Sequence, residues 1–315
     1  MRKNDPYPRA IRPMLATLVD GPFTDRDWVF EIKWDGYRTI AMVNHGKVRL
    51  LSRNAQVFTE TFAPVTATLD GLRHDAVIDG EIVVLDDMGR SRFQLLQTWK
   101  KTGQGTLVYC AFDLLWLDGH RLDALPLLDR KELLKTVLPG NPTIMYSEHV
   151  PERGEDFFRT ARKSGLEGIM AKRKDSGYHA GIRSRDWLKI KTHARQEVVI
   201  AGYTEGRGSR KHFGALVLGV YEGNDLIYVG HTGTGFDEDT LEDVQAKLHR
   251  LERKTSPFDD VPVTNAPVRW VRPTLVAEVR FQEWTNDGVM RQPVFLGLRS
   301  DKNAHDVRRE RVSST

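Results

Sequence analysis

The chain has 315 residues, and its 40% hydrophobic and 29% charged content is typical of a folded globular protein with a sizeable core. Its formal net charge of +4 permits a polyanionic partner without requiring one. Cys110 is the single cysteine, which excludes an intramolecular disulfide and a thiolate metal cluster and fits a reducing cytosol. We find neither a secretory signal nor an apolar run of the roughly 20 residues that cross a bilayer, so no membrane partner is expected.

Strand-like segments dominate the first half of the chain. Residues 28–52 alternate in polarity around a turn at Asn44-His45-Gly46, which predicts a hairpin. Strands are also expected at 76–90 and 107–119, and the second of these is apolar enough to be buried on both faces. Helices are expected at 60–69, 93–100, 128–137, and from 155 to a stop at Gly165.

After residue 191 the pattern changes to short, evenly spaced strands separated by glycine turns, with one helix at 238–251. About 110 residues of this kind suggest a small Greek-key barrel of the OB type. We therefore expect an α+β protein with a first domain of antiparallel sheets and flanking helices (1–195), a barrel (196–303) and a frayed polar tail (304–315). Residues 1–195 carry 31 Lys and Arg against 25 Asp and Glu, so the basic surplus lies in the first domain.

The segment FEIKWDGYRT places a lysine between two carboxylates. If the segment is a continuous strand, Glu31, Lys33 and Asp35 project to one face. A partly desolvated lysine has a lowered pKa and can act as a nucleophile. Arg38 supplies a rigid fork that suits phosphate or carboxylate. Taken alone, an exposed charged strand face explains this segment equally well.

Later segments carry polar residues that would suit a nucleotide. Ser52-Arg53-Asn54 stands at a strand end, where it could contact phosphate. Asp79 and Glu81 share one face of a strand and could hold a ribose or a divalent ion, because two carboxylates in a hydrophobic sheet are costly without a partner. Phe112, beside Asp113, could stack on a base. The alternatives are an arginine partner for the carboxylates and a core position for Phe112.

Two more segments follow the same pattern. Glu167 stands at the start of a strand, with Lys172 five residues on. Lys189 and Lys191 are two residues apart, so both ammoniums reach one strand face and could hold one phosphate. A solvated charge run is the alternative for Lys172, but six such segments in this order are much less plausible as accidents than any one of them.

In this order the segments resemble the motifs of the covalent nucleotidyltransferase superfamily, which comprises ATP-dependent DNA ligases, RNA ligases and mRNA capping enzymes. KWDGYR looks like the signature whose lysine becomes adenylylated, and RQPVFLGLRSDK (291–302) resembles the last motif, carried on an OB domain. PMLATLVD, CAFDLLWLDG and GLEGIMAKRKDSGY look most like the ligase module of bacterial end-joining ligases of the ligase D type. The resemblance implies a nucleotidyltransferase (adenylation) domain followed by an OB-fold domain.

The resemblance also implies roles for individual residues. Lys33 would be the nucleophile, and Arg38, Lys189 and Lys191 would complete the catalytic set. Asp35 and Glu167 would bind Mg²⁺ or Mn²⁺. The residues expected to contact ATP are Glu31, Ile32, Lys33, Arg38, Arg53, Glu81, Phe112, Lys172, Lys189, Lys191, Arg299 and Lys302. DNA phosphates would meet Arg38 and Arg53.

The expected function is ATP-dependent sealing of 5′-phosphate/3′-hydroxyl breaks in duplex DNA through a lysyl-AMP intermediate, in repair by end joining. The expected partner is nicked or broken duplex DNA, with a Ku-like end-binding protein left open, and the expected state is a monomer in the bacterial cytoplasm, at the nucleoid. An RNA ligase or a capping-type guanylyltransferase is the nearest alternative. A non-catalytic OB-fold protein that binds nucleic-acid ends is an alternative from another class.

Overall fold

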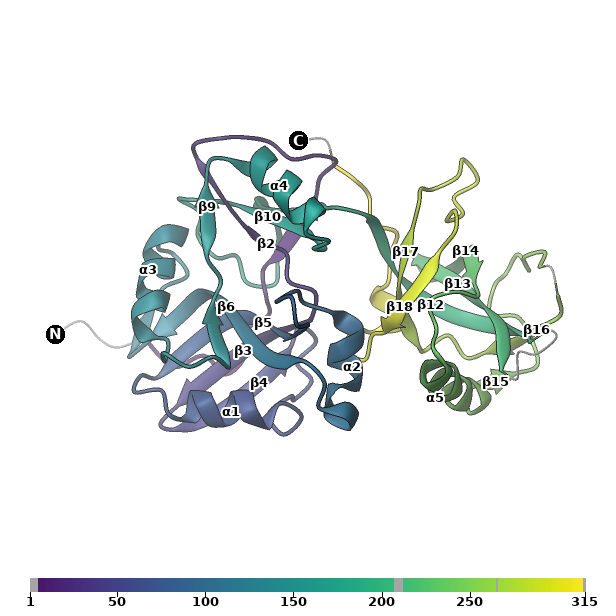
Figure 1. The fold of residues 1–315 in the computed structure, drawn as a ribbon, viewed down its shortest axis with the longest axis horizontal. Coiled ribbons are helices and arrows are strands. Elements are labelled where there is room, and N and C mark those ends of the chain that lie inside the picture. Colours follow the sequence, from purple (N-terminus) through teal and green to yellow (C-terminus); the bar gives the residue numbers. More distant parts are fainter. Residues whose placement is uncertain (1–4, 207–211, 265, 314–315) are drawn as a thin grey trace. The chain divides into compact units, whose positions relative to one another are not determined.

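The computed structural model describes residues 5–206, 212–264 and 266–313, and the chain divides into two compact units. The first unit comprises Met1–Thr192 with Arg311–Thr315, and the second comprises His193–Glu310. The first unit combines largely antiparallel sheets with flanking helices, and the second combines one antiparallel sheet with helix α5 (Glu238–His249) (Figure 1), as predicted for the α+β class. The division falls three residues before the boundary expected at 195. Within the described ranges, no helix has the length and apolar character needed to cross a membrane.

The first sheet of the first unit has the strand order β1 (Leu15–Leu18), β11 (Arg183–Lys191), β10 (Gly168–Arg173), β2 (Trp28–Ile32), β9 (His149–Pro151). One face is apolar and packs Phe30, Ile169 and Leu188 against helix α4 (Gly154–Lys163). Side chains alternate across a strand, so Lys172 and its cross-strand partner Trp187 lie on the opposite face. That opposite face carries the candidate site.

The second sheet has the order β4 (Lys47–Ser52), β3 (Tyr37–Asn44), β5 (Ala76–Leu85), β6 (Thr106–Leu117), β7 (His120–Arg121), and β8 (Ile144–Tyr146) pairs with β6. Helices α1 (Ala63–Asp70), α2 (Phe93–Thr102) and α3 (Leu127–Val137) pack on β4, β5 and β6 respectively. The predicted hairpin joins β3 and β4, and His45 and Gly46 adopt φ values of 49° and 71° at its turn. Such values are typical of a two-residue hairpin loop.

An apolar cluster joins the two sheets. It contains Val29 and Trp187 from the first sheet and Ile40, Val77 and Phe112 from the second. Each sheet therefore has one face on helices and part of its other face on the second sheet. The polar side chains beside this cluster lie between the sheets, which is where long-range pairs can form.

The segment that contains Lys33 is not a continuous strand, contrary to our prediction. Strand β2 ends at Ile32 in the first sheet, and β3 starts at Tyr37 in the second, so residues 33–36 carry the chain from one sheet to the other. Glu31, Lys33 and Asp35 consequently do not share a strand face. The crossing needs a very close approach, because a Cβ atom on Gly36 would lie 2.1 Å from the carbonyl oxygen of Ile82.

We expect Gly36→Ala to lower the free energy of unfolding by about 1–3 kcal/mol, since the new methyl group must displace the β5 backbone. Gly21→Ala is the matched control, because a Cβ atom there meets nothing within 4 Å. Urea unfolding of both variants measures the difference. Equal stability of the two variants would contradict the close approach at Gly36.

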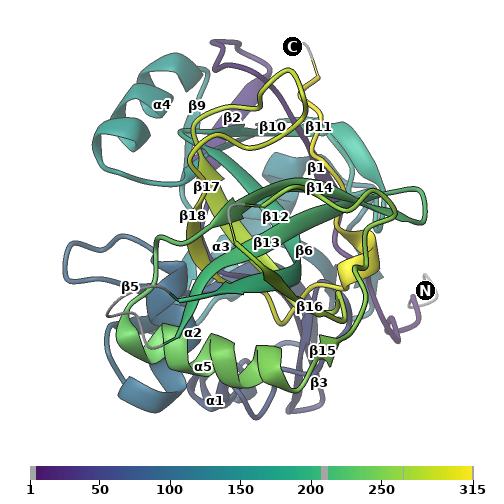
Figure 2. The same ribbon diagram turned by 90° about the vertical axis from the view of Figure 1, so that its right-hand side faces the viewer.

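The second unit contains the strands and the helix of the small barrel that the sequence predicted. Its strands follow the order β14 (Asp225–Thr232), β13 (Phe213–Glu222), β12 (Ala194–Glu205), β16 (Val268–Val271), β15 (Glu252–Arg253), and β17 (Val276–Phe281) pairs with both β12 and β18 (Val294–Leu298). The long strand β12 bonds to β17 through its first half and to β16 through its end, so one strand serves two parts of the barrel. Figure 2 shows helix α5 (Glu238–His249) beneath these strands. Asp237 caps α5 by accepting a 2.8 Å hydrogen bond from the Thr240 amide.

The C-terminal segment is packed where we expected a frayed tail. A short 3-10 helix, Ala304–Asp306, follows the barrel, and both Ala304 and Val307 are buried in the barrel core. The amide of Tyr221 donates to the Val307 carbonyl, at 2.9 Å. Ala304 and Val307 anchor this segment in the barrel core. The sequence did not predict this packing because most of the residues around them are polar or charged. Residues 314–315 lie outside the described ranges.

Candidate active site

Lys33 lies where the chain leaves strand β2. Its amide donates to the Gly168 carbonyl at 3.0 Å, and its Nζ lies 2.6 Å from Oε1 of Glu167. The Lys33 side chain is 21% exposed and that of Glu167 is 4% exposed. The amine is therefore held against a carboxylate and largely withdrawn from bulk water, which is the environment that the sequence predicted for a nucleophilic lysine.

Glu31, two residues earlier, is buried and binds two ammonium groups. Its Oε1 lies 2.9 Å from Nζ of Lys131, and its Oε2 lies 2.9 Å from Nζ of Lys172. Burial by itself raises the pKa of Glu31, but the two lysines more than offset this and hold it below its usual value. If Glu31 contacts ATP directly, as predicted, ATP must compete with these two lysines for the Glu31 carboxylate.

Lys131 was not among the residues that the sequence predicted. Helix α3 buries Leu127, Lys131 and Leu134 together, so the lysine occupies a position that the helical period reserves for an apolar residue. A charged residue at a core-facing position of the predicted helix is the sequence feature that could have singled out Lys131. Its depth is clear from the structure, because the Lys131 side chain is 1% exposed.

We expect Glu31→Gln to lower the free energy of unfolding at pH 7 by roughly 2–3 kcal/mol, because two buried ammoniums lose their charged acceptor. The folded pKa of Glu31 lies below its ordinary value of 4.5, so its contribution is complete above that pH and is lost as the pH falls through the folded pKa. The gap between wild type and variant should therefore close in acid. Urea unfolding between pH 3 and pH 7 tests this, and a gap that stays constant would contradict it.

Lys172 and Phe112 form an aromatic and cationic cluster. Nζ of Lys172 lies 4.3 Å from the ring centroids of both Phe112 and Trp187, and burial lowers the pKa of Lys172 to about 8. Cζ of Arg38 lies 4.6 Å from the centroid of Phe112. Phe112 thus has the surroundings of a core residue, the alternative that the sequence left open. Its predicted stacking on adenine remains a prediction, and it requires one of these side chains to move.

Arg38 is bound to Asp79 on the neighbouring strand. Its Nε and Nη2 lie 2.5 Å from the two carboxylate oxygens, and the Tyr178 hydroxyl donates to Oδ2 at 2.6 Å. Asp79 is fully buried, so it fits the arginine-pairing alternative better than a ribose contact. Burial opposes the charge on Arg38, but Asp79 raises its pKa overall. One fifth of the Arg38 side chain stays exposed, and its predicted contact with a DNA phosphate stays a prediction.

The remaining predicted residues lie on neighbouring strands. Glu81 is half-buried on β5 and directly opposite Arg38 on β3. Lys189 and Lys191 alternate along β11 opposite Met170 and Gly168, so they share the strand face of Trp187. This arrangement agrees with the predicted pairing of the two ammoniums on one face.

Three further predicted residues border this region. Ile32 is half-buried and ends β2 opposite Ile169. Asp35 is buried in the crossing segment, where its amide donates to the Ser91 hydroxyl at 3.1 Å. Arg53 is half-exposed in the turn that follows β4. None of these observations tests the assigned roles, which stay predictions.

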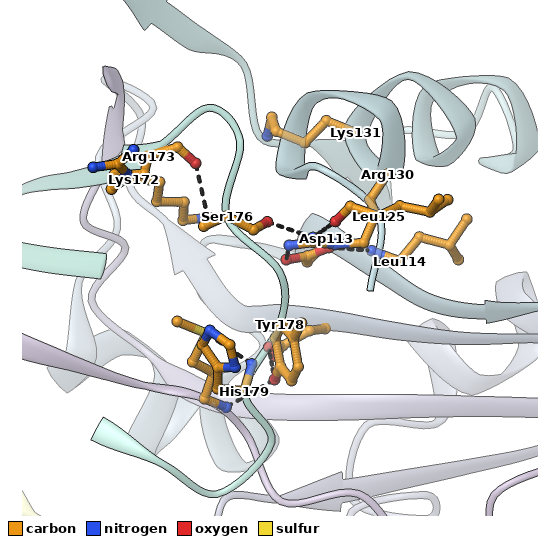
Figure 3. Close-up of polar contacts among 12 residues, drawn as sticks. Asp113, Leu114, Leu125, Arg130, Lys131, Lys172, Arg173, Ser176, Tyr178 and His179 are labelled. Atoms are coloured by element: carbon orange, nitrogen blue, oxygen red, sulfur yellow. Dashed lines mark hydrogen bonds and ion pairs between the residues drawn. The ribbon is translucent and has the colours of Figure 1, made fainter. Parts of the chain in front are cut away.

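A fully buried ion pair connects three parts of the first unit near the candidate site. Arg130 of α3 lies 2.7 and 2.8 Å from the two oxygens of Asp113 on β6, and both side chains are 0% exposed. Figure 3 shows the same guanidinium reaching the carbonyl of Ser176, at 2.8 Å, and that of Leu125. Arg130 therefore ties α3 and β6 to the segment that follows β10.

The metal prediction can be compared with the donors present. In the described parts of the chain, no three His, Cys, Asp or Glu side chains gather in a way that could hold a metal ion. Carboxylates such as Asp35 and Glu167 suit Mg²⁺ or Mn²⁺, and Mg²⁺ is commonly held by one or two carboxylates together with substrate phosphates. The residues therefore fit a metal that arrives with the nucleotide rather than a metal in a protein-only cage.

Arg299 and Lys302 lie in the second unit and are bound to its own carboxylates. Arg299 donates twice to Asp301, both at 2.9 Å, and its Nη1 lies 3.1 Å from Glu278. Nζ of Lys302 lies 2.8 Å from Glu197. Burial raises the pKa of Glu197, but Lys302 and Arg299 bring it down to about 2. Each cation is thus paired within the barrel.

Comparison with known proteins agrees with this arrangement of domains. Residues 13–191 match the family model described as the ATP dependent DNA ligase domain, and residues 209–302 match the ATP dependent DNA ligase C terminal region. Over 315 aligned residues the chain is 41% identical to the multifunctional non-homologous end joining protein LigD of Pseudomonas aeruginosa, covering 97% of this chain and 37% of that protein.

Two solved structures are also similar. Mycobacterial DNA ligase D complexed with ATP and MES matches with 38% identity and a TM-score of 0.72, over 94% of this chain and 97% of its own. The ligase domain from M. tuberculosis LigD matches with 39% identity and a TM-score of 0.53, over 95% and 98% of the two chains.

The chain spans 37–40% of the length of the curated LigD proteins that it matches. Within that span, both predicted domains are matched in the predicted order, so a nucleotidyltransferase domain followed by an OB-fold domain is confirmed. The similarity to ligase D, stated from the motifs alone, is confirmed as well. This chain belongs to the ATP-dependent DNA ligase family.

Proposed function

We propose that this ligase joins a 5′-phosphate to a 3′-hydroxyl in duplex DNA through an AMP–lysine intermediate on Lys33, and that it serves non-homologous end joining. The observation that carries the proposal is the 2.6 Å contact between Nζ of Lys33 and Glu167. It presents one amine in a fixed position, and Lys189 and Lys191 stand on a strand that pairs with the strand beginning beside Glu167.

In the first transfer, Nζ of Lys33 attacks the α-phosphorus of ATP. A nitrogen–phosphorus bond forms, the bond to the bridging oxygen breaks, and pyrophosphate leaves. Glu167 lies within hydrogen-bond distance of the proton that the amine must lose. Lys189 and Lys191 would neutralise the α-phosphate, since phosphoryl transfer depends mainly on positioning and charge stabilisation.

The second and third transfers act on DNA. AMP passes from Lys33 to the 5′-phosphate, and the 3′-hydroxyl then attacks that phosphate and releases AMP. Arg38 and Arg53 would hold phosphates at the break, and Asp35 with Glu167 would hold the metal. When bound, Mg²⁺ or Mn²⁺ would neutralise charge on phosphate oxygens. Such phosphate contacts read duplex shape more than base sequence.

The test uses ATP labelled at the α-phosphate, with Mg²⁺ or Mn²⁺. We expect label that stays on the denatured protein and is chased from it by nicked duplex DNA as the nick is sealed. Labelling by GTP instead of ATP would favour a capping-type guanylyltransferase, and sealing of nicked RNA alone would favour an RNA ligase. DNA-end binding without any labelling would favour the non-catalytic alternative and overturn the proposal.

The relatives support the biological assignment. LigD of Pseudomonas aeruginosa is named as a multifunctional non-homologous end joining protein. By analogy we assign this chain to repair of broken DNA at the bacterial nucleoid, acting as a monomer, with a Ku-like end-binding protein as its candidate partner. Sealing of linear duplex ends, with and without such a protein, measures this part of the proposal separately from nick sealing.

A further inference from the structure

Ser147 lies in the connection between β8 and β9 and uses all its polar atoms in different directions. Its amide donates to the Ala111 carbonyl on β6 at 2.7 Å, and its carbonyl accepts from Nζ of Lys131 at 3.0 Å. Its hydroxyl accepts from the Trp34 indole N–H at 3.1 Å and lies 3.4 Å from Oε2 of Glu31. Its side chain is buried, with the whole residue 1% exposed.

Two of these contacts involve residues close to Lys33 in the sequence, one before it and one after it. Trp34 follows Lys33 directly and packs its ring against the apolar cluster of Val83, Val108 and Cys110. Glu31 precedes Lys33 by two residues and is fixed by Lys131. One serine therefore joins the residues on either side of the amine to a strand of the second sheet and to helix α3.

The Trp34–Ser147 hydrogen bond adds a side-chain attachment to the backbone contacts of the crossing segment. Between β2 and β3 the chain crosses from one sheet to the other, and here the Lys33 amide donates to the Gly168 carbonyl at 3.0 Å and the Asp35 amide donates to the Ser91 hydroxyl at 3.1 Å. An amine that attacks phosphorus in line must hold its position to a fraction of an ångström. The hydrogen bond from the Trp34 indole N–H to the Ser147 hydroxyl restrains the residue that follows Lys33.

We propose that Ser147 is a positioning residue for the lysine adenylylation step, acting through Trp34 and Glu31. This inference rests on the proposed function, in which Lys33 takes AMP. In this role Ser147 acts through Trp34 and Glu31 rather than through a contact of its own with the nucleotide or the DNA. It governs the first two transfers, which use the lysine, and not the third, in which the 3′-hydroxyl attacks DNA that already carries AMP.

This difference between steps gives the test. In single-turnover experiments at saturating ATP, we expect Ser147→Ala to slow labelling of the protein about 10- to 100-fold, the range that a small misplacement of a reacting group produces. Sealing of a nick that already carries AMP on its 5′-phosphate should change less than about 3-fold, because that step needs no lysine. Ser164→Ala, the same change at an exposed position of this unit, should leave both rates unchanged.

A second variant keeps the test decisive if Ser147→Ala does not fold. Trp34→Phe removes the indole N–H and leaves Ser147 in place, and it should slow labelling selectively as well. In the double variant the two losses should not add, because both remove the same hydrogen bond. If Ser147→Ala slowed labelling of the protein and sealing of the AMP-carrying nick equally, or left labelling unchanged, the inference would be overturned. A wild-type chain that takes no label would instead overturn the proposed function.

Discussion

Lys33→Ala is expected to reduce covalent labelling by ATP by at least about 10³-fold, because loss of a covalent nucleophile removes the reaction path itself. In the proposed mechanism this amine, whose Nζ lies 2.6 Å from Oε1 of Glu167, is the attacking group. Because the variant also leaves the buried Glu167 carboxylate without this partner, urea unfolding is measured beside labelling to show that the variant is folded in the assay. Gel autoradiography of the denatured protein after incubation with α-labelled ATP measures the effect.

Lys135→Ala is the matched control for this experiment. Lys135 is an exposed lysine of α3 whose Nζ lies 3.0 Å from Glu148 and 5.1 Å from the ring centroid of Tyr146, and the Lys135 and Glu148 side chains are both more than 60% exposed. Its replacement should leave labelling unchanged. Persistent labelling of Lys33→Ala would show that another group takes AMP, and it would remove the foundation of the mechanism proposed above.

Asp113→Ala is expected to lower the free energy of unfolding by about 3–5 kcal/mol, because it strands the Arg130 guanidinium in a site without solvent. Both side chains of this pair are 0% exposed, and Asp113 accepts two hydrogen bonds from Arg130. A loss of that size is a large fraction of the stability of a typical domain. Urea unfolding at pH 7 measures it.

The control is Asp175→Ala, which removes the partner of Arg173 on the surface. That pair is exposed, at 42% and 68% for the two side chains, and solvent screens it, so we expect little change. If Asp113→Ala is no more harmful than this control, the buried pair does not support the fold. Combining Asp113→Leu with Arg130→Met should recover only part of the loss, because the carbonyls of Leu125 and Ser176 lose their donor.

Local sequence patterns predicted most of the elements. The hairpin at His45-Gly46 and helix α3 follow from turn chemistry and periodicity, which act over a few residues. The proximity of Lys33 and Glu167 was predictable only from the ordered motifs, because 134 residues separate the two in sequence. No local pattern contains that contact.

The errors share a physical cause. The sequence predicted a strand that continued past Ile32, where β2 ends, because alternation of polarity does not reveal that the chain passes from one sheet to another. The partner of Asp79 could be guessed as an arginine, but only the register of β3 against β5 identifies it as Arg38. Lys131 escaped notice because a buried charge is recognised by its partner, and that partner lies 100 residues away at Glu31. Pairings between distant strands decide each of these cases.

The paired cations of the barrel have a consequence for turnover. Arg299 and Lys302 are balanced by Asp301, Glu278 and Glu197, so this part of the barrel offers a polyphosphate no uncompensated positive charge. If these two cations contact the phosphates of ATP, an ATP contact being what the family resemblance implies for both, phosphate oxygens must first replace carboxylate oxygens on them. The carboxylates stay tethered nearby and would rebind once the pyrophosphate moves. The carboxylates would then compete with pyrophosphate for the same cations, and this competition would favour its release.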